Sequence, residues 1–222
     1  MTAAPVTPVT REGPAGPADG TTRDRLLQAA RDVLADHGLE GLTLRAIARQ
    51  AGVSHGAPLR HFPTLAALLS AVAAEGFARL QATVTAGIEA AEREAAAAGD
   101  DLGPRRRLAA AGRAYVRFAL DDPGVFSVTF RPERVDLTDP AYQAEGYQAF
   151  HQLVGLVEAA QADGWHPDER ADELAAVAWA AVHGIATLAL HGGLTGAVVD
   201  ADPVRLQSLS SLLMLGPEGD LR

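Results

Sequence analysis

The chain has 222 residues, of which 48% are apolar and 21% are charged, so it is long enough to bury a substantial core. It contains no cysteine, which excludes disulfides, thiolate metal centres and thiol nucleophiles and is consistent with a reducing cytoplasm. The net charge of −9 argues against a protein that coats nucleic acid, but residues 21–70 carry a net charge of +2 and residues 71–222 a net charge of −10. A mildly basic segment therefore precedes a strongly acidic remainder.

Both ends of the chain are predicted to be tails, at residues 1–20 and 217–222. The first is rich in Pro and Gly and shows no apolar period or basic, hydrophobic leader, so we expect a disordered tail on a cytoplasmic protein. The longest uncharged apolar run, from Leu174 to Leu194, has the length of a membrane span. It is rich in Ala and carries His and Gly, so we expect a buried helix of a soluble protein.

Three helices are predicted within residues 21–63. The first has a capping box at Thr21 and runs from about Arg23 to His37. Thr43 is expected to cap the second helix, which Gly52 ends, and Ser54 to cap the third. Proline fits only the first turn of a helix, so Pro58 places the start of the third helix near Ser54 or His55 and makes it about seven residues long.

The rest of the chain also has helical periodicity, and no stretch alternates with a period of two. The sequence is therefore predicted to be all-α. The expected elements are a long helix from Thr64 to Gly99, helices at 104–121, 140–162, 172–190 and 203–215, a short apolar segment at 125–130 and a loop at 131–139.

The order of helix, short turn with glycine, and short second helix is that of a helix-turn-helix. The second helix must be short and exposed so that it can enter the major groove, and the first must pack over it. Leu44, Ile47, Ala48 and Val53 supply the small core that fixes the angle between them.

The stretch from Gly38 to Pro63 resembles the TetR family of transcriptional regulators, with Gly52, Ser54, Gly56 and His61-Phe62 in the family's order. The resemblance implies about nine helices, with a helix-turn-helix DNA-binding domain at 21–75 and a helical effector-binding and dimerisation domain at 76–216. It also implies a homodimeric repressor that a small molecule releases from a palindromic operator in double-stranded DNA. Trp179, His183 and Gly184 resemble a TetR subgroup with a Trp-His-Gly signature in its C-terminal domain.

Carried over to this chain, the family's DNA contacts fall on Thr43, Arg45, Ser54, His55, Gly56, Ala57, Arg60 and His61. Leu59 and Leu65 stand where the family usually has Tyr and Lys, which commonly meet phosphate. Leu cannot bind phosphate, so fewer phosphate contacts and a shallower salt dependence are expected, by roughly one unit of slope per lost charged contact.

The C-terminal part holds nine of the aromatic residues, and an effector cavity is expected among them. The candidate ligand-binding residues are Tyr115, Phe118, Phe126, Phe130, Tyr147, Phe150, His151, Trp179 and His183. The two terminal helices are expected to pair with their two-fold mates in a four-helix dimer interface. Its candidate residues are Ala178, Ala181, Ile185, Leu206, Leu209 and Leu213.

Other functions are less well supported. His151, His183 and His191 lack an acid at ligand spacing, so no metal or other cofactor is predicted. The carboxylate pairs Asp121-Asp122 and Asp168-Glu169 lie at loops or helix starts, where capping explains them, so no catalytic residue and no enzyme activity is predicted. Two alternatives remain. One is a TetR-like ligand- or protein-binding module that has lost operator binding. The other is an all-α enzyme that uses His151 or His183 as a base.

Overall fold

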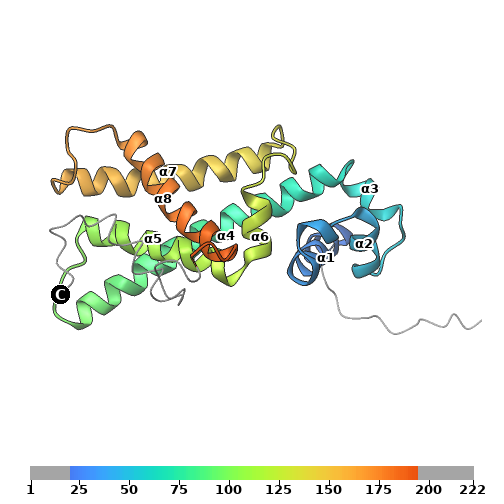
Figure 1. Ribbon diagram of the computed structural model, residues 1–222, viewed down its shortest axis with the longest axis horizontal. Helices are drawn as coiled ribbons and strands as arrows, with labels where there is room; N and C mark the ends of the chain where they lie inside the picture. The colour runs from blue at the N-terminus through green and yellow to red at the C-terminus, as the bar shows by residue number, and fades with distance from the viewer. Residues whose placement is uncertain (1–20, 195–222) are drawn as a thin grey trace, which may run out of the picture.

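The computed structural model describes residues 21–194, and every regular element in that range is helical. Figure 1 shows a long molecule with α1–α3 gathered at one end and the other helices extending away from them. The elements are α1 (Thr22–His37), a 3-10 turn (Leu39–Gly41), α2 (Leu44–Gln50), α3 (Ala57–His61), α4 (Leu65–Ala97), α5 (Pro104–Asp121), α6 (Pro123–Thr129), α7 (Pro140–Ala162) and α8 (Ala171–Leu190).

The first three helices pack around one end of the hydrophobic core, which continues into the other helices. Leu26, Ala30 and Ile47 are fully buried in it, and Phe62 closes it where α3 ends. The capping box predicted at the start of α1 is present, because the Thr21 hydroxyl accepts from the Asp24 N–H and the Asp24 carboxylate accepts from the Thr21 N–H. The N-terminal segment therefore has the expected three-helix arrangement.

The prediction for the start of α3 is wrong, because the helix begins at Ala57 and its N-cap is Gly56. A helix that began at Ser54 would use the N–H of residue 58 for its first i to i−4 bond, and Pro58 has none. The Ala57 N–H instead donates to the Ser54 carbonyl at 2.9 Å, which makes a turn. The helix is consequently five residues long rather than about seven.

Helix α4 is the axis of the molecule and joins its two parts. It begins after Thr64, whose hydroxyl accepts from the Ala67 N–H, and continues without interruption to Ala97. The domain boundary expected near residue 75 therefore falls inside a continuous helix. Beyond that point α4 packs against α5, α6 and α7.

The short apolar segment predicted at 125–130 is a helix, α6, which packs close to both parts of the molecule. Asp122 caps it by accepting from the Val125 N–H. A Cβ on Gly124 would lie 3.1–3.2 Å from Leu34 of α1, and a Cβ on Gly76 of α4 would overlap Thr129. These glycines allow α6 to lie directly against α1 on one side and α4 on the other.

Helices α7 and α8 complete the described part of the C-terminal bundle. Both α4 and α8 are long and apolar enough to cross a membrane, by length and composition alone. Here α4 packs at the centre of the bundle and α8 packs against α5 and α7. The helix expected at 203–215 lies outside the described residues, as do both predicted tails.

Candidate functional site

The helix-turn-helix geometry is fixed by a helix cap, a glycine turn and a hydrogen bond from α1. Thr43 caps α2 by accepting from the Ala46 N–H at 3.1 Å, as the sequence predicts. Gly52 has a φ of +64°, a left-handed conformation that favours glycine. Arg25 of α1 donates to the Ala51 carbonyl at 2.6 Å and so ties the turn to the first helix.

The polar residues of α3 and its preceding turn face solvent. Arg60 and His61 are exposed, whereas Pro58 and Phe62 are buried, so α3 presents one face to its own core and the other outward. No heavy atom lies within 4 Å of a Cβ built on Gly56, so the backbone there is also open. Of the predicted DNA contacts, Ala57 is half-buried and the rest are exposed, namely Thr43, Arg45, Ser54, His55, Gly56, Arg60 and His61.

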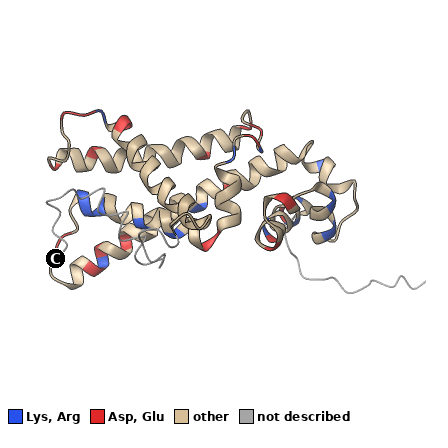
Figure 2. Cartoon of the chain, viewed as in Figure 1, with Lys and Arg blue, Asp and Glu red and all other residues tan. Residues whose placement is uncertain are grey.

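The arginines of α2 and α3 have no acidic partner in the described part of the chain. Arg45, Arg49 and Arg60 are exposed, and within residues 21–194 no carboxylate lies within 4 Å of their guanidinium groups. Figure 2 shows blue segments on these helices. Arg49 was not among the predicted contacts, although its spacing of four residues from Arg45 could have indicated it. Unpaired arginines on a convex helical surface provide the positive charge that phosphate binding needs.

The two leucines that depart from the family pattern have different environments. Leu59 lies on the outer face of α3 with 56% of its surface exposed. Leu65, the first residue of α4, is half-buried and packs against the core. Leu59 is therefore placed to touch DNA without binding phosphate, whereas Leu65 serves packing.

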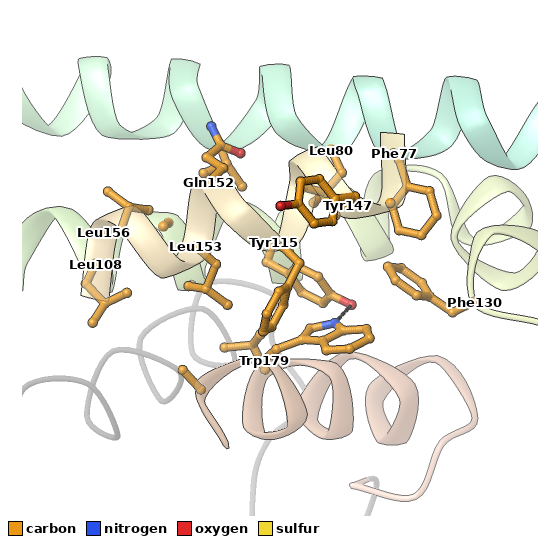
Figure 3. Close-up of a pocket in the computed structure, with 18 of the residues that line it drawn as sticks. Phe77, Leu80, Leu108, Tyr115, Phe130, Tyr147, Gln152, Leu153, Leu156 and Trp179 are labelled. Atoms are coloured by element: carbon orange, nitrogen blue, oxygen red, sulfur yellow. Dashed lines mark hydrogen bonds between the residues drawn. The ribbon is translucent and has the colours of Figure 1, made fainter. Parts of the chain in front are cut away.

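A second candidate site is a cavity of about 320 Å³ between α4, α5, α7 and α8. This volume is at the lower end of the range of about 300–1,000 Å³ that is typical of small-molecule sites. Its wall is almost wholly apolar, and Figure 3 shows aromatic and aliphatic side chains converging on it. The lining residues are Phe77, Leu80, Val84, Leu108, Ala111, Gly112, Tyr115, Phe130, Tyr142, Gln143, Gly146, Tyr147, Ala149, Phe150, Gln152, Leu153, Leu156, Ala178, Trp179 and Val182.

A chain of hydrogen bonds runs behind this wall. The Trp179 indole N–H donates to the Tyr115 hydroxyl at 3.2 Å, and that hydroxyl lies 2.8 Å from His183 Nδ1. Indole can only donate, so the Tyr115 oxygen accepts from it, and the Tyr115 proton can be donated to His183 Nδ1 in the tautomer that leaves this nitrogen unprotonated. Burial raises the pKa of Tyr115 and lowers the pKa of His183, which keeps both groups neutral.

The predicted ligand-binding residues divide into two groups. Tyr115, Phe130, Tyr147, Phe150 and Trp179 line the cavity. The other four are absent from the lining. Phe118, Phe126 and His183 lie behind the wall, where they contact other aromatic rings, and exposed His151 stacks on Tyr147 with ring centroids 4.0 Å apart.

Most of the aliphatic lining was missed. Leu80 and Val84 have the spacing of an ordinary apolar stripe on α4, and nothing in the sequence distinguishes a side chain that borders a cavity from one that fills a core. Leu153 and Leu156 of α7 have the same ambiguity.

Helix α8 has an apolar face that is exposed to solvent. Ala178 is buried against the cavity, and Ala181 and Ile185 are half-buried. The solvent-facing apolar residues of α8 include Val177, with 68% of its surface exposed, Ala180 and Leu188, with 49% exposed, and Trp179 of the cavity wall is 39% exposed. Val177, Ala180 and Leu188 form, together with Gly184, an apolar stripe along the helix, which we call the α8 stripe. Leu206, Leu209 and Leu213 lie outside the described residues.

No metal-binding cluster is present among residues 21–194, since no three His, Asp or Glu side chains are placed to hold an ion. The Asp121-Asp122 pair is used structurally. Asp121 pairs with Arg117 at 2.8 Å and Asp122 with Arg79 at 2.7 Å. These carboxylates are therefore committed to ion pairs and helix capping.

Both parts of the chain match known regulatory proteins. Residues 26–72 match the family of bacterial regulatory proteins called the tetR family, and residues 108–211 match the tetracyclin repressor-like C-terminal domain. The HTH-type transcriptional repressor AcnR of Corynebacterium efficiens is 39% identical over 64 residues, which are 29% of this chain and about a third (34%) of that repressor.

Solved structures extend the similarity to nearly the whole chain. A Rhodococcus sp. RHA1 protein of unknown function is 36% identical, with a TM-score of 0.70 over 89% of this chain and 95% of that one. A transcriptional regulator from the same organism is 26% identical, with a TM-score of 0.60 over 87% of this chain and 94% of that one.

The helix-turn-helix, its unpaired arginines and the helical bundle behind it define a DNA-binding transcriptional regulator. The chain belongs to the TetR family, as the sequence predicts. The narrower Trp-His-Gly subgroup remains a prediction.

Proposed function

We propose that this TetR-family regulator is a cytoplasmic homodimeric repressor that binds a palindromic operator and is released when a small molecule fills the cavity. It acts by binding and carries no catalytic residue. The proposal depends most on one observation: α3 is exposed, and Arg45, Arg49 and Arg60 on α2 and α3 have no carboxylate partner within residues 21–194. Such a helix enters the major groove, and the two-fold axis of a dimer requires two half-sites.

The DNA contacts divide into two kinds. Arg60, His55 and the open backbone at Gly56 lie on or beside α3 and are proposed to meet base edges. Thr43, Arg45, Ser54, Ala57 and His61 surround them and are proposed to position the helix on the duplex, largely through phosphate.

The cavity is proposed to control DNA binding through α6. Phe130, which directly follows α6, lines the cavity, and Gly124 near its other end packs against Leu34 of α1. A ligand that moves Phe130 shifts α6 and therefore α1, which carries the helix-turn-helix. The effect cannot exceed the ligand's differential affinity for the two states, which typically gives about 1–3 kcal/mol of coupling.

The dimer interface is proposed to include the α8 stripe. An apolar stripe that no described residue covers is suited to a second copy of the same helix across a two-fold axis. The helix expected at 203–215 would add Leu206, Leu209 and Leu213. Ala178, Ala181 and Ile185 then support the interface from the inner side of α8.

DNase I footprinting of the purified protein on the DNA upstream of its own coding sequence tests the function. The expected result is a protected palindrome, bound more tightly than scrambled DNA and with a shallow salt dependence. Equal binding to both DNAs, or none, would contradict operator recognition. The alternative is a module that does not bind an operator, and the exposed Leu59 provides its test. If that alternative holds, Leu59→Tyr should create an affinity for DNA that the parent lacks.

A further inference from the structure

The cavity is long and narrow. Its lining residues on α7 extend from Tyr142 to Leu156, which is about 21 Å along the helix axis. A volume of about 320 Å³ distributed over such a length leaves room for an extended molecule and not for a bulky, round one.

The two ends of the cavity differ in chemistry. Helices α4 and α7 run in the same direction, since Gly146 faces Phe77 and Gln152 donates to Thr85, and α5 runs opposite to α4. This arrangement gathers aliphatic side chains at one end and rings at the other, as Figure 3 shows with Leu108 and Leu156 on the left and Phe77 and Phe130 on the right.

The aromatic end favours a flat ring. Phe77 and Phe130 pack edge to face with centroids 5.4 Å apart, and Trp179 lies 6.0 Å from Phe130. A further ring can add to such a cluster in offset or edge-to-face geometry. The aliphatic end, formed by Val84, Leu108, Leu153 and Leu156, offers only methyl groups and suits a hydrocarbon tail.

The described wall carries no charge that could pair with an ionised ligand. No lining residue among those described is Asp, Glu, Lys, Arg or His. The amide N–H groups of Gln143 and Gln152 donate to the Leu137 carbonyl and the Thr85 hydroxyl, and the Tyr115 hydroxyl is engaged by Trp179 and His183. A charged group held among the buried side chains of this wall would have no opposite charge to pair with, which is unfavourable.

We infer that the cavity binds an uncharged aromatic molecule with an alkyl tail, with the tail between Leu108 and Leu156 and the ring against Phe77, Phe130 and Trp179. The inference rests on the proposed function, because this molecule would be the effector that releases the operator.

Isothermal titration calorimetry of the full chain with three probes tests the ligand class. 4-Hexylphenol is expected to bind at least tenfold more tightly than 4-ethylphenol, which lacks most of the tail, and than 4-hexylbenzoate, which carries a charge. Equal or tighter binding of the benzoate or the ethyl compound would overturn the inference, as would absence of binding by all three. A fourth probe is 1-decanol, which has no ring. Tighter binding of 1-decanol than of 4-hexylphenol would overturn the inference that the ligand is aromatic.

A substitution at the aliphatic end locates the tail. Leu156→Trp, or Leu156→Phe if the larger side chain impairs folding, should reduce the affinity for 4-hexylphenol at least tenfold and leave that for 4-ethylphenol unchanged. Leu137→Trp, at an exposed apolar position outside the cavity, is the matched control and should change neither. Equal losses for both phenols would contradict the proposed orientation.

The DNA footprint separates the two proposals. If the protein protects the operator but binds none of the probes, the proposed DNA-binding function stands and the proposed ligand class is wrong. Tight binding of 4-hexylphenol that does not release protected DNA would keep the ligand class and contradict its role as effector.

Discussion

Arg60 lies on the exposed side of α3, and none of the carboxylates in residues 21–194 neutralises it. Arginine can donate two parallel hydrogen bonds to the O6 and N7 atoms of guanine, which no other base pair presents in the same way. Its neighbours Leu59 and His61 are also exposed, but neither has this bidentate geometry. Arg60 is therefore the residue most suited to read sequence.

Arg60→Ala should weaken operator binding by about 1–3 kcal/mol and reduce the preference for the operator over scrambled DNA, because a base contact is lost. Fluorescence anisotropy with both DNAs measures the two affinities. Arg117→Ala on α5, where Arg117 pairs with Asp121, is the control and should leave both affinities unchanged. Equal losses on both DNAs would show that Arg60 binds phosphate instead.

His183 should make the stability of the protein depend on pH. Burial among Tyr115, Phe126 and Phe130 lowers its pKa below the ordinary value of 6.5. The unfolded chain therefore takes up this proton first as the pH falls. His183 contributes full stability above about pH 6.5, and this contribution is lost as the pH falls through the lower pKa of the folded state.

Asn can place a side-chain group where Nδ1 lies but does not titrate, so His183→Asn should give a free energy of unfolding that falls less steeply between about pH 7 and 5 than that of the parent. Urea denaturation at several pH values measures it. The other histidines and the carboxylates are common to both proteins, so their contributions cancel in the comparison. Identical slopes would mean that His183 is not held neutral.

At the scale of elements, the short helix α6 contacts both parts of the molecule. It has seven residues, yet it contacts α1, α4 and α5. Gly76 allows α4 to approach it closely, because a Cβ there would overlap the Thr129 hydroxyl and come within 2.9 Å of Val125. Thr129 is fully buried and donates to the Val125 carbonyl at 2.8 Å, so it cannot easily move aside.

Gly76→Ala should therefore lower the free energy of unfolding by about 1–3 kcal/mol through overpacking. Gly155→Ala on α7 is the matched control, since no atom lies within 4 Å of its added Cβ, and it should raise stability by about 0.5–1 kcal/mol through helix propensity. Urea denaturation followed by circular dichroism measures both. Changes of the same sign would contradict the close contact between α4 and α6.

The sequence was sufficient to predict the helices, but not which side of each helix is buried. The caps at Thr21 and Thr43 depend on local hydrogen bonds, and both predictions are confirmed. The prediction for the start of α3 is wrong, because the Ala57 N–H donates to the Ser54 carbonyl in a turn that precedes the helix. The sequence could not predict which face of α8 packs inward, because the helix is apolar nearly all round. The buried face is determined by the helices that pack against it.

The cavity was predicted only through its aromatic residues. Tyr115 and Trp179 were anticipated because large rings with a polar atom are typical of binding sites. Leu108 and Leu156 were not, because the cavity exists only where four helices meet, and the pattern within one helix carries no information on that.

At the scale of the whole molecule, the exposed helix-turn-helix lies at one end and the cavity between helices farther along α4 (Figure 1). A single α3 of five residues contacts only one half-site, and its affinity for DNA is limited accordingly. Two copies held together gain the second contact at high effective concentration, which can raise affinity by orders of magnitude. In the proposed dimer, operator binding at useful strength therefore depends on both copies.

Val177→Asp tests this dependence, because Val177 is the most exposed large apolar residue of the α8 stripe. A carboxylate buried in an apolar two-fold interface would face its own copy, so dimerisation should weaken strongly. Sedimentation velocity should then show the mass of one chain, and operator affinity should fall by at least tenfold while the helical circular dichroism spectrum remains unchanged. Leu137→Asp is the control, because it introduces the same charge at an exposed residue outside α8 (51% exposed), and it should keep the sedimenting mass and the operator affinity of the parent.

A Val177→Asp protein that still sediments as a dimer would place the interface away from α8. A monomeric parent that protects a palindrome would refute the two-fold arrangement itself.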